Sequence, residues 1–279
     1  MRSLIIILAL FAMTSFSEAA TLNIVAVGDS LTAATGWPER LQAQLGAAYS
    51  GLTVNVTKQA LGGITTVEML ATYIPAAIAA NPNVIIIMAG TNEPYYSYPA
   101  ADFQSRMESI IALVQAANNG SSQYNGKIFL VLVTNPPAAQ CGGSWAYCRE
   151  GSSPDPSNGN KIYGTQIADQ TVIMENLASQ YGLPVVDMYN GIKSFAGWDT
   201  FGGSAALLSD GVHFVTKGYY LISTIIQSRL VNYLKPDGTV MDVSPAYTGL
   251  NIVRPASDRL YPQGFLLAAH RRSLLGVGR

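Results

Sequence analysis

Histidine is the scarcest chemically useful residue in this 279-residue chain, which contains only His213 and His270. His270 lies in the C-terminal tail beside two arginines, whereas His213 follows Asp210 by three residues in the segment SDGVHF. A turn between Asp210 and His213 can bring the carboxylate to the imidazole, where it fixes the tautomer and stabilises the protonated ring. A histidine base would therefore be His213, oriented by Asp210. In the alternative interpretation, Asp210 only caps a turn and His213 only packs.

Ser30 is the candidate nucleophile for such a base. It lies in VAVGDSLTAATGW, directly after an apolar run and Gly28, and the short side chains that follow leave its hydroxyl accessible. A serine hydroxyl becomes a useful nucleophile only beside a base, which His213 can supply. A serine between a strand and a helix can also simply cap the helix, and this interpretation stays open on Ser30 alone.

Two further segments could supply hydrogen-bond donors to a developing oxyanion. LGGITT places Gly62 and Gly63 just before a helical pattern, and backbone N–H groups at a helix start favour an anion. AGTNEP places Asn92 directly after an apolar run, where its side-chain amide offers an uncharged donor. A glycine turn and an Asx-turn are the alternative explanations.

Four short segments in this order resemble the motifs of the GDSL-type, or SGNH, hydrolase family: GDSLT (28–32), GGITT (62–66), GTNE (90–93) and DGVH (210–213). The resemblance extends over residues 22–234. It implies that Ser30 is the nucleophile, that His213 is the base and that Asp210 orients His213. It also implies an oxyanion hole made by the Ser30 N–H, the Gly63 N–H and the Asn92 side chain, and neither a cofactor nor a metal.

The chain departs from the family pattern at three positions. Lys58 and Ala60 stand where the second motif usually has Asn and an earlier Gly, which leaves Gly62 as a competitor for Gly63. Glu93 follows Asn92 where the third motif often has Asp. No Gly-x-Ser-x-Gly segment is present, so the nucleophile elbow of the α/β-hydrolases does not apply.

The elements that must position these residues alternate along the chain. Strand-like apolar runs occupy 22–27, 52–57, 83–90, 127–134 and 183–188, and helical patterns occupy 37–49, 65–80, 102–118, 161–182 and 216–234. The central runs are apolar throughout, which is typical of parallel strands covered on both faces. We therefore expect an α/β three-layer sandwich with a central five-stranded parallel sheet. In such folds ligands bind beyond the carboxyl ends of the strands.

The ends of the chain differ from its middle. Residues 1–19 contain Arg2 and an apolar run too short to span a bilayer, which predicts a secretory signal peptide and an extracellular protein. Residues 20–235 then form the hydrolase domain, and residues 236–279 are an extension without an assigned role. In a secreted chain, the closely spaced pair Cys141 and Cys148 predicts a disulfide.

Composition narrows the choice of partners. A formal net charge of −1 with 12% charged residues argues against nucleic acid and polybasic membrane binding. No later stretch predicts a membrane-spanning helix, so we expect no stable membrane insertion. Aromatic and polar loops around the candidate site favour a carbohydrate carrying short acyl esters, such as acetyl, over a lipid. The predicted substrate rim consists of Tyr95, Trp145 and Trp198.

Three alternatives accompany this hypothesis. The first is a lipase or lysophospholipase of the same family. The second is a metal-dependent phosphoesterase, which would normally draw on more than one suitably placed histidine, and which EDTA would inactivate. The third is a secreted carbohydrate-binding protein without catalysis, which a serine-reactive phosphonate should fail to label.

Overall fold

The computed structural model describes residues 20–120, 128–137, 163–199 and 206–234. Over these ranges five parallel strands form one sheet in the order β2-β1-β3-β4-β5. The predicted α/β class and five-stranded parallel sheet are confirmed. The strands are β1 (Ala20–Gly28), β2 (Leu52–Ala60), β3 (Val84–Met88), β4 (Phe129–Val133) and β5 (Val185–Val186).

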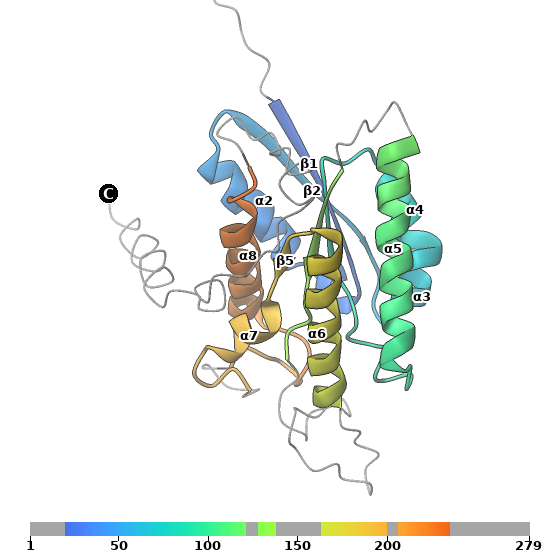
Figure 1. Ribbon diagram of the computed structural model, residues 1–279. Coiled ribbons are helices and arrows are strands. Elements are labelled where there is room, and N and C mark those ends of the chain that lie inside the picture. The colour runs from blue at the N-terminus through green and yellow to red at the C-terminus, as the bar shows by residue number, and fades with distance from the viewer. Residues whose placement is uncertain (1–19, 121–127, 138–162, 200–205, 235–279) are drawn as a thin grey trace, which may run out of the picture.

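Helices cover both faces of the sheet and produce the three layers (Figure 1). One face carries α2 (Trp37–Ala48), α7 (Met188–Lys193) and α8 (Thr216–Leu230). The other face carries α4 (Ile74–Ala79), α5 (Ala100–Gly120) and most of the apolar side of α6 (Tyr163–Tyr181).

The two central strands explain the unbroken apolar runs of the sequence. Every residue of β3 and β4 is buried, because both faces of these strands meet helices. Ile86 and Met88 join the core under α2 and α8, whereas Ile85 and Ile87 join the core under α4 and α5. Alternate residues of one strand thus belong to two different cores.

The helix expected over 65–80 is present as three consecutive pieces. They are α3 (Thr66–Glu68), a π-helical turn η1 (Met69–Tyr73) and α4, whose first turn contains Pro75. Proline lacks an N–H and cannot continue the regular α-helical ladder, so the widened turn before it is the physical consequence. The short helices α1 (Ser30–Ala33) and α7 were not expected from the sequence.

Some of the predictions concern residues outside the described ranges. The signal peptide, the C-terminal extension, Trp145 and the pairing of Cys141 with Cys148 all remain predictions. Among the helices that the structure does describe, none combines the length and the apolar character needed to cross a membrane.

Candidate active site

Ser30 is presented at the carboxyl end of β1 by a tightly packed turn. β1 ends at Gly28, and Ser30 opens the single-turn helix α1. The Asp29 carboxylate caps this helix, since its Oδ1 accepts a hydrogen bond from the Leu31 N–H at 3.0 Å. A Cβ on Gly28 would lie 2.9 Å from the Met88 carbonyl oxygen, which explains glycine at this position by close approach of the backbone.

The loop that carries Asp210 and His213 is a closed turn before α8. An antiparallel bridge between Leu208 and Phe214 holds its two ends together. Gly211 lies inside the turn with a φ of +95°, a conformation that favours glycine. The backbone therefore reverses between Asp210 and His213 and brings both side chains to the same side.

The three proposed catalytic side chains form a continuous hydrogen-bonded series. The His213 Nε2 lies 2.9 Å from the Ser30 Oγ, and the His213 Nδ1 lies 2.7 Å from the Asp210 Oδ2. Asp210 Oδ1 also accepts the backbone N–H groups of Val212 at 3.0 Å and His213 at 2.8 Å. The structure thus brings together residues 183 positions apart in the sequence, in the order nucleophile, base, orienting carboxylate.

Electrostatics favour an ionised Asp210. Burial by itself raises the pKa of this carboxyl group, but hydrogen bonds from the His213 backbone and side chain and from the Val212 backbone outweigh it. The net result is a pKa below the ordinary aspartate value. A carboxylate at Asp210 can stabilise the positive charge that His213 acquires when it takes a proton.

Of the two predicted oxyanion segments, the glycine segment lies near Ser30 and the Asn92 segment is hydrogen-bonded to the glycine segment. A Cβ on Gly62 would lie 3.7 Å from the Ser30 Cβ, and Gly63 has a left-handed φ of +82°. The Asn92 Nδ2 donates a hydrogen bond of 2.9 Å to the carbonyl oxygen of Ile64. This bond fixes the orientation of the Asn92 amide beside the glycine turn, as preorganised donors require.

Two buried acids beside the site were not predicted from the sequence to belong to the esterase site, although Asp29 was a possible ligand in the metal-dependent alternative. Asp29 is 1% exposed and Glu93 is fully buried. The Glu93 Oε1 accepts the Thr66 N–H at 2.6 Å, so it joins the Asn92 loop to the start of α3. Burial raises the pKa of both carboxyl groups, and the charge of Asp29 raises that of Glu93 further. The departure of Glu93 from the family motif was the available sequence signal.

Glu93→Gln should reduce the loss of thermal stability that occurs as the pH rises from about 5 to about 8. Because the folded pKa of Glu93 is raised, its contribution to stability is fully present below the unfolded value and is lost as the pH rises through the folded value. Glutamine cannot ionise, and its oxygen can still accept the Thr66 N–H. We expect the melting temperature of Glu93→Gln minus that of the wild type to increase from about pH 5 to about pH 8.

Glu68→Gln is the matched control for this comparison. Glu68 caps α3 through the Thr65 N–H at 2.8 Å, and hydrogen bonds outweigh burial to lower its pKa. A lowered pKa affects stability only as the pH falls into the acid range, so the difference for Glu68→Gln should stay flat over the same interval. If the difference in melting temperature between Glu93→Gln and the wild type also stays constant over this pH interval, the assignment of a buried, ionisable Glu93 is contradicted.

Exposed apolar side chains occur on the two segments that carry the glycine turn and Asn92. Leu61 and Val67 flank the glycine turn at 55% and 40% exposure, and Tyr95 and Tyr96 follow Asn92 at 48% and 51%. We call these four residues the rim, as distinct from the substrate rim predicted from the sequence, with which they share Tyr95. Isolated exposed apolar residues are ordinary, but these four share the two segments predicted to form the oxyanion hole, so the rim is a candidate binding surface.

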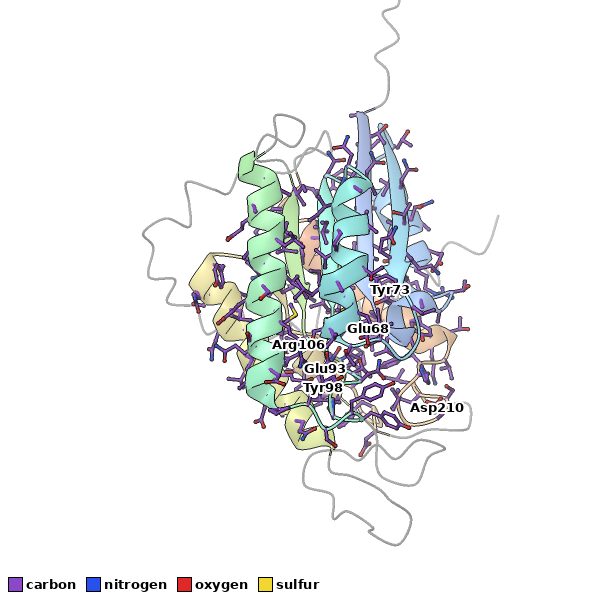
Figure 2. The ribbon with its side chains drawn as sticks, turned by 90° about the vertical axis from the view of Figure 1, so that its right-hand side faces the viewer. Glu68, Tyr73, Glu93, Tyr98, Arg106 and Asp210 are labelled. Carbon is purple, nitrogen blue, oxygen red and sulfur yellow. The ribbon has the colours of Figure 1, made fainter. Side chains whose placement is uncertain are left out.

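The tyrosine rings of the rim are supported by contacts with neighbouring side chains. Tyr96 stacks on Tyr98 with ring centroids 6.0 Å apart, and the Arg106 guanidinium lies 4.5 Å from the Tyr98 centroid. Arg106 also forms a 3.1 Å ion pair with Asp102 on α5. Figure 2 shows Tyr98, Glu93 and Arg106 at the same end of the molecule as Asp210.

Trp198 is the second residue of the predicted substrate rim that the structure describes. It is partly buried and packs against the core formed under α2 and α8. Part of its apolar area is thereby used for packing, and its place in the substrate rim remains a prediction.

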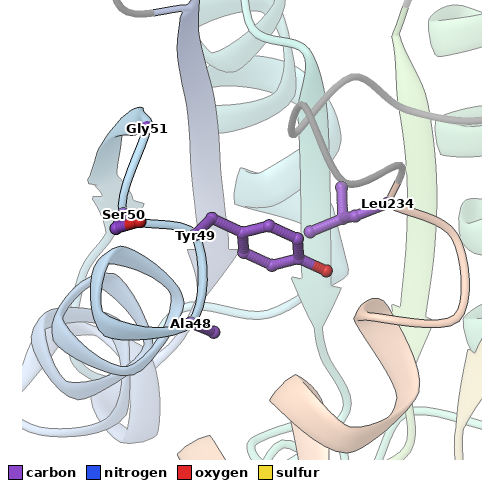
Figure 3. Close-up of a pocket in the computed structure, with 5 residues that line it drawn as sticks. All are labelled: Ala48, Tyr49, Ser50, Gly51 and Leu234. Carbon is purple, nitrogen blue, oxygen red and sulfur yellow. The ribbon is translucent and has the colours of Figure 1, made fainter.

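A separate pocket of about 380 Å³ lies at the opposite end of the sheet (Figure 3). It is lined by the segment Ala48–Gly51, which precedes β2, and by Leu234, which follows α8. The amino ends of the strands lie there, so this pocket is remote from Ser30. No group of three His, Cys, Asp or Glu side chains suited to a metal ion occurs within the described ranges.

Solved structures with the same fold are hydrolases of several kinds. A lipase/acylhydrolase from Enterococcus faecalis matches with a TM-score of 0.58 at 21% identity, covering 77% of this chain and 98% of that one. The M. smegmatis aryl esterase matches with a TM-score of 0.57 at 20% identity, covering 76% and 100%. A mutant acetyl-xylooligosaccharide esterase from Geobacillus Stearmophilus matches with a TM-score of 0.53 at 16% identity, covering 76% and 96%.

The sequence itself decides the family. A comparison with curated protein sequences finds no significant match. The model of the GDSL-like Lipase/Acylhydrolase family, however, matches residues 26–221, which include Ser30, the glycine turn, Asn92 and both Asp210 and His213. The matched region thus contains Ser30, His213 and Asp210, which the structure joins by hydrogen bonds. By this match the chain belongs to the GDSL-like lipase/acylhydrolase family.

Proposed function

We propose that this acylhydrolase is a secreted serine esterase that works by two-step acyl transfer. The observation that carries the proposal is the series Ser30 Oγ, His213 and Asp210, with contacts of 2.9 and 2.7 Å. Secretion rests on the predicted signal peptide at residues 1–19.

The first step forms an acyl-enzyme. His213 Nε2 takes the proton of Ser30 as the Ser30 oxygen bonds to the ester carbonyl carbon, and the carbonyl electron pair moves onto its oxygen. When the carbonyl re-forms, the bond to the alcohol oxygen breaks and His213 gives its proton to that oxygen. Water then repeats the sequence against the acyl-serine, so that the acid leaves and Ser30 regains its proton.

The oxyanion of each tetrahedral intermediate needs donors aimed at it. We assign them to the Ser30 N–H at the start of α1, the Gly63 N–H and the Asn92 side chain, as the family resemblance implies. Two observations support this assignment: the position of Gly62 near the Ser30 side chain, and the Asn92 bond to Ile64, which ties Asn92 to the glycine segment. Fixed donors reduce the reorganisation needed when negative charge develops.

Asn92→Ala should lower kcat by roughly 10²- to 10³-fold with little change in KM. A donor to the oxyanion acts mainly after charge has developed, so it affects the transition state more than the bound substrate. Steady-state kinetics with p-nitrophenyl acetate measures both constants. A raised KM at normal kcat would instead make Asn92 a substrate-binding residue.

We propose a carbohydrate carrying short acyl esters, such as acetyl, as the substrate. Tyr95 and Tyr96 supply exposed aromatic faces on the segment that follows Asn92, and contacts with Tyr98 and Arg106 support them. Rigid aromatic faces pack well against the C–H faces of sugar rings. Structures with this fold include an acetyl xylan esterase, an aryl esterase and a lipase/acylhydrolase, so fold likeness does not choose among these substrates.

A lipid ester is the second candidate, favoured by one observation. Leu61 and Val67 are exposed aliphatic side chains on the rim. The sequence alone suggested an aromatic and polar surround, and these two residues add the kind of surface that an acyl chain contacts. The rim therefore has an aromatic part and an aliphatic part, which can be tested separately.

Two rim variants distinguish the candidates. For an acetylated carbohydrate, Tyr95→Ala should reduce kcat/KM on acetylated xylooligosaccharide by about tenfold, a loss of the size expected for one aromatic contact. Its activity on p-nitrophenyl acetate should stay within about twofold. Val67→Ser is the matched control and should leave both substrates unaffected. A preference for long-chain acylglycerols that Val67→Ser weakens would overturn the carbohydrate assignment and support the lipid one.

A further inference from the structure

Lys58 is the residue that departs from the family motif at the start of the glycine segment, and its side chain has a well-defined set of partners. It lies on β2, where it pairs in register with Ala26 of β1. Its Nζ donates to the carbonyl oxygens of Ala33 at 3.1 Å and Ala34 at 3.3 Å, and to Glu39 Oε1 at 2.6 Å. An ammonium group has three N–H donors, so these contacts use all of them.

The two carbonyls belong to the end of the helical turn that begins with Ser30. The Ala33 and Ala34 N–H groups bond back to the carbonyls of Asp29 and Ser30 within the same turn. Helix ends leave carbonyl groups without intrahelical partners, and a cation there satisfies them. Lys58 is thus connected to the nucleophile through one turn of backbone.

Glu39 completes the arrangement from the other side. Its second oxygen, Oε2, accepts the Gly36 N–H at 2.9 Å and caps the start of α2. A Cβ on Gly36 would lie 2.7 Å from the Tyr219 ring, so the loop also packs against α8. The loop 33–36 is therefore held between the Lys58–Glu39 pair and the Tyr219 ring.

We propose that Lys58, together with Glu39, is a positioning residue for the nucleophile, which holds the turn Ser30–Ala33 in the orientation needed for attack. This inference rests on the proposed serine-esterase function. The side chains of Lys58 and Glu39 are 28% and 44% exposed, and ion pairs this exposed contribute little to overall stability. Their effect is instead expected on catalysis, where small displacements of a nucleophile are costly.

Lys58→Met tests the role directly, because it keeps the aliphatic stem and removes the donors. We expect kcat on p-nitrophenyl acetate and the rate of phosphonate inactivation to fall together by about 10- to 100-fold, with KM within about twofold. Lys58→Arg keeps the charge and several donors, and it should restore most of both rates.

Gln42→Met is the matched control. The Gln42 Oε1 accepts the Val56 N–H at 2.8 Å and so joins the same two elements, α2 and β2, away from the nucleophile loop. It should leave kcat within about twofold. An equal loss in Gln42→Met, or no recovery in Lys58→Arg, would reduce Lys58 to a structural residue and overturn the proposal.

Reaction with the phosphonate separates failure of the proposed function from failure of the role proposed for Lys58. A wild-type enzyme that does not react with the phosphonate overturns the proposed function and the role of Lys58 together. A reactive wild type with an equally reactive Lys58→Met overturns only the role of Lys58. If Lys58→Met does not fold, Glu39→Gln takes its place with an expected loss of about three- to tenfold, and an unchanged rate there contradicts the proposal.

Discussion

Replacing Ser30 or His213 by alanine is expected to lower kcat for ester hydrolysis by roughly 10⁴- to 10⁶-fold. In the proposed mechanism Ser30 forms the covalent bond to the acyl group, and His213 takes its proton across a contact of 2.9 Å. Because the two act as one unit, the double variant should lose little more than either single variant. Kinetics with p-nitrophenyl acetate and circular dichroism of each variant provide the measurement.

His270→Ala is the control for this experiment. It removes the other histidine of the chain, which lies in the C-terminal extension, and should leave kcat unchanged. Loss of activity in a folded His270→Ala protein would show that the base has been assigned to the wrong residue. Losses for Ser30 and His213 that multiply in the double variant would show that the two residues do not act together.

Replacing Asp210 by asparagine is expected to lower kcat by roughly 10³- to 10⁴-fold. Asp210 Oδ2 accepts the His213 Nδ1 proton at 2.7 Å, which leaves Nε2 as the acceptor for the proton of Ser30. An asparagine amide placed there donates to Nδ1 and favours the opposite tautomer, in which Nε2 carries a proton and cannot act as the base. The oxygen of the new amide could still accept the backbone bonds, so the fold should persist.

Asp187→Asn is the matched control for Asp210→Asn. Asp187 caps α7 in a similar way, with its Oδ1 accepting the Asn190 N–H at 3.0 Å. This variant should retain full activity. Comparable activity losses in the two variants would indicate that Asp210 matters only as a turn cap, the alternative interpretation left open by the sequence.

The pH dependence of the melting temperature provides a second, independent test of the role of Asp210. The pKa of Asp210 is lowered in the folded state, so its carboxylate stabilises the fold above the ordinary aspartate pKa and loses that contribution as the pH falls through the folded value. Any deficit in melting temperature of Asp210→Asn relative to the wild type should therefore shrink in acid.

The sheet could be predicted because its signal is local. The runs that became β3 and β4 are apolar at every position, and a strand buried on both faces needs no other information. The broken helix over 65–80 was harder, since Pro75 signals a disturbance but not whether the chain kinks, ends or widens. The single turn α1 is too short to show a helical period at all.

The candidate site could likewise be predicted only in part from the sequence. Asp210 and His213 lie three residues apart, so their proximity could be inferred from the sequence, whereas the contact of His213 with Ser30 depended on the fold. The supporting contacts of Lys58 and Glu93 could not be foreseen, because they join segments that are distant in sequence through side chains with several rotamers. Trp198 shows the limit of composition, since the sequence did not indicate that this aromatic residue packs partly against the core.

Mass spectrometry of the enzyme after reaction with a fluorophosphonate tests the central claim most directly. A nucleophilic serine attacks phosphorus, loses its proton to the histidine and displaces fluoride, which leaves a stable covalent adduct. We predict a single adduct on the peptide that contains Ser30, with labelling strongly slowed in His213→Ala and unaffected in His270→Ala. An active enzyme that remains unlabelled, or that carries its adduct on a residue other than Ser30, would contradict the account.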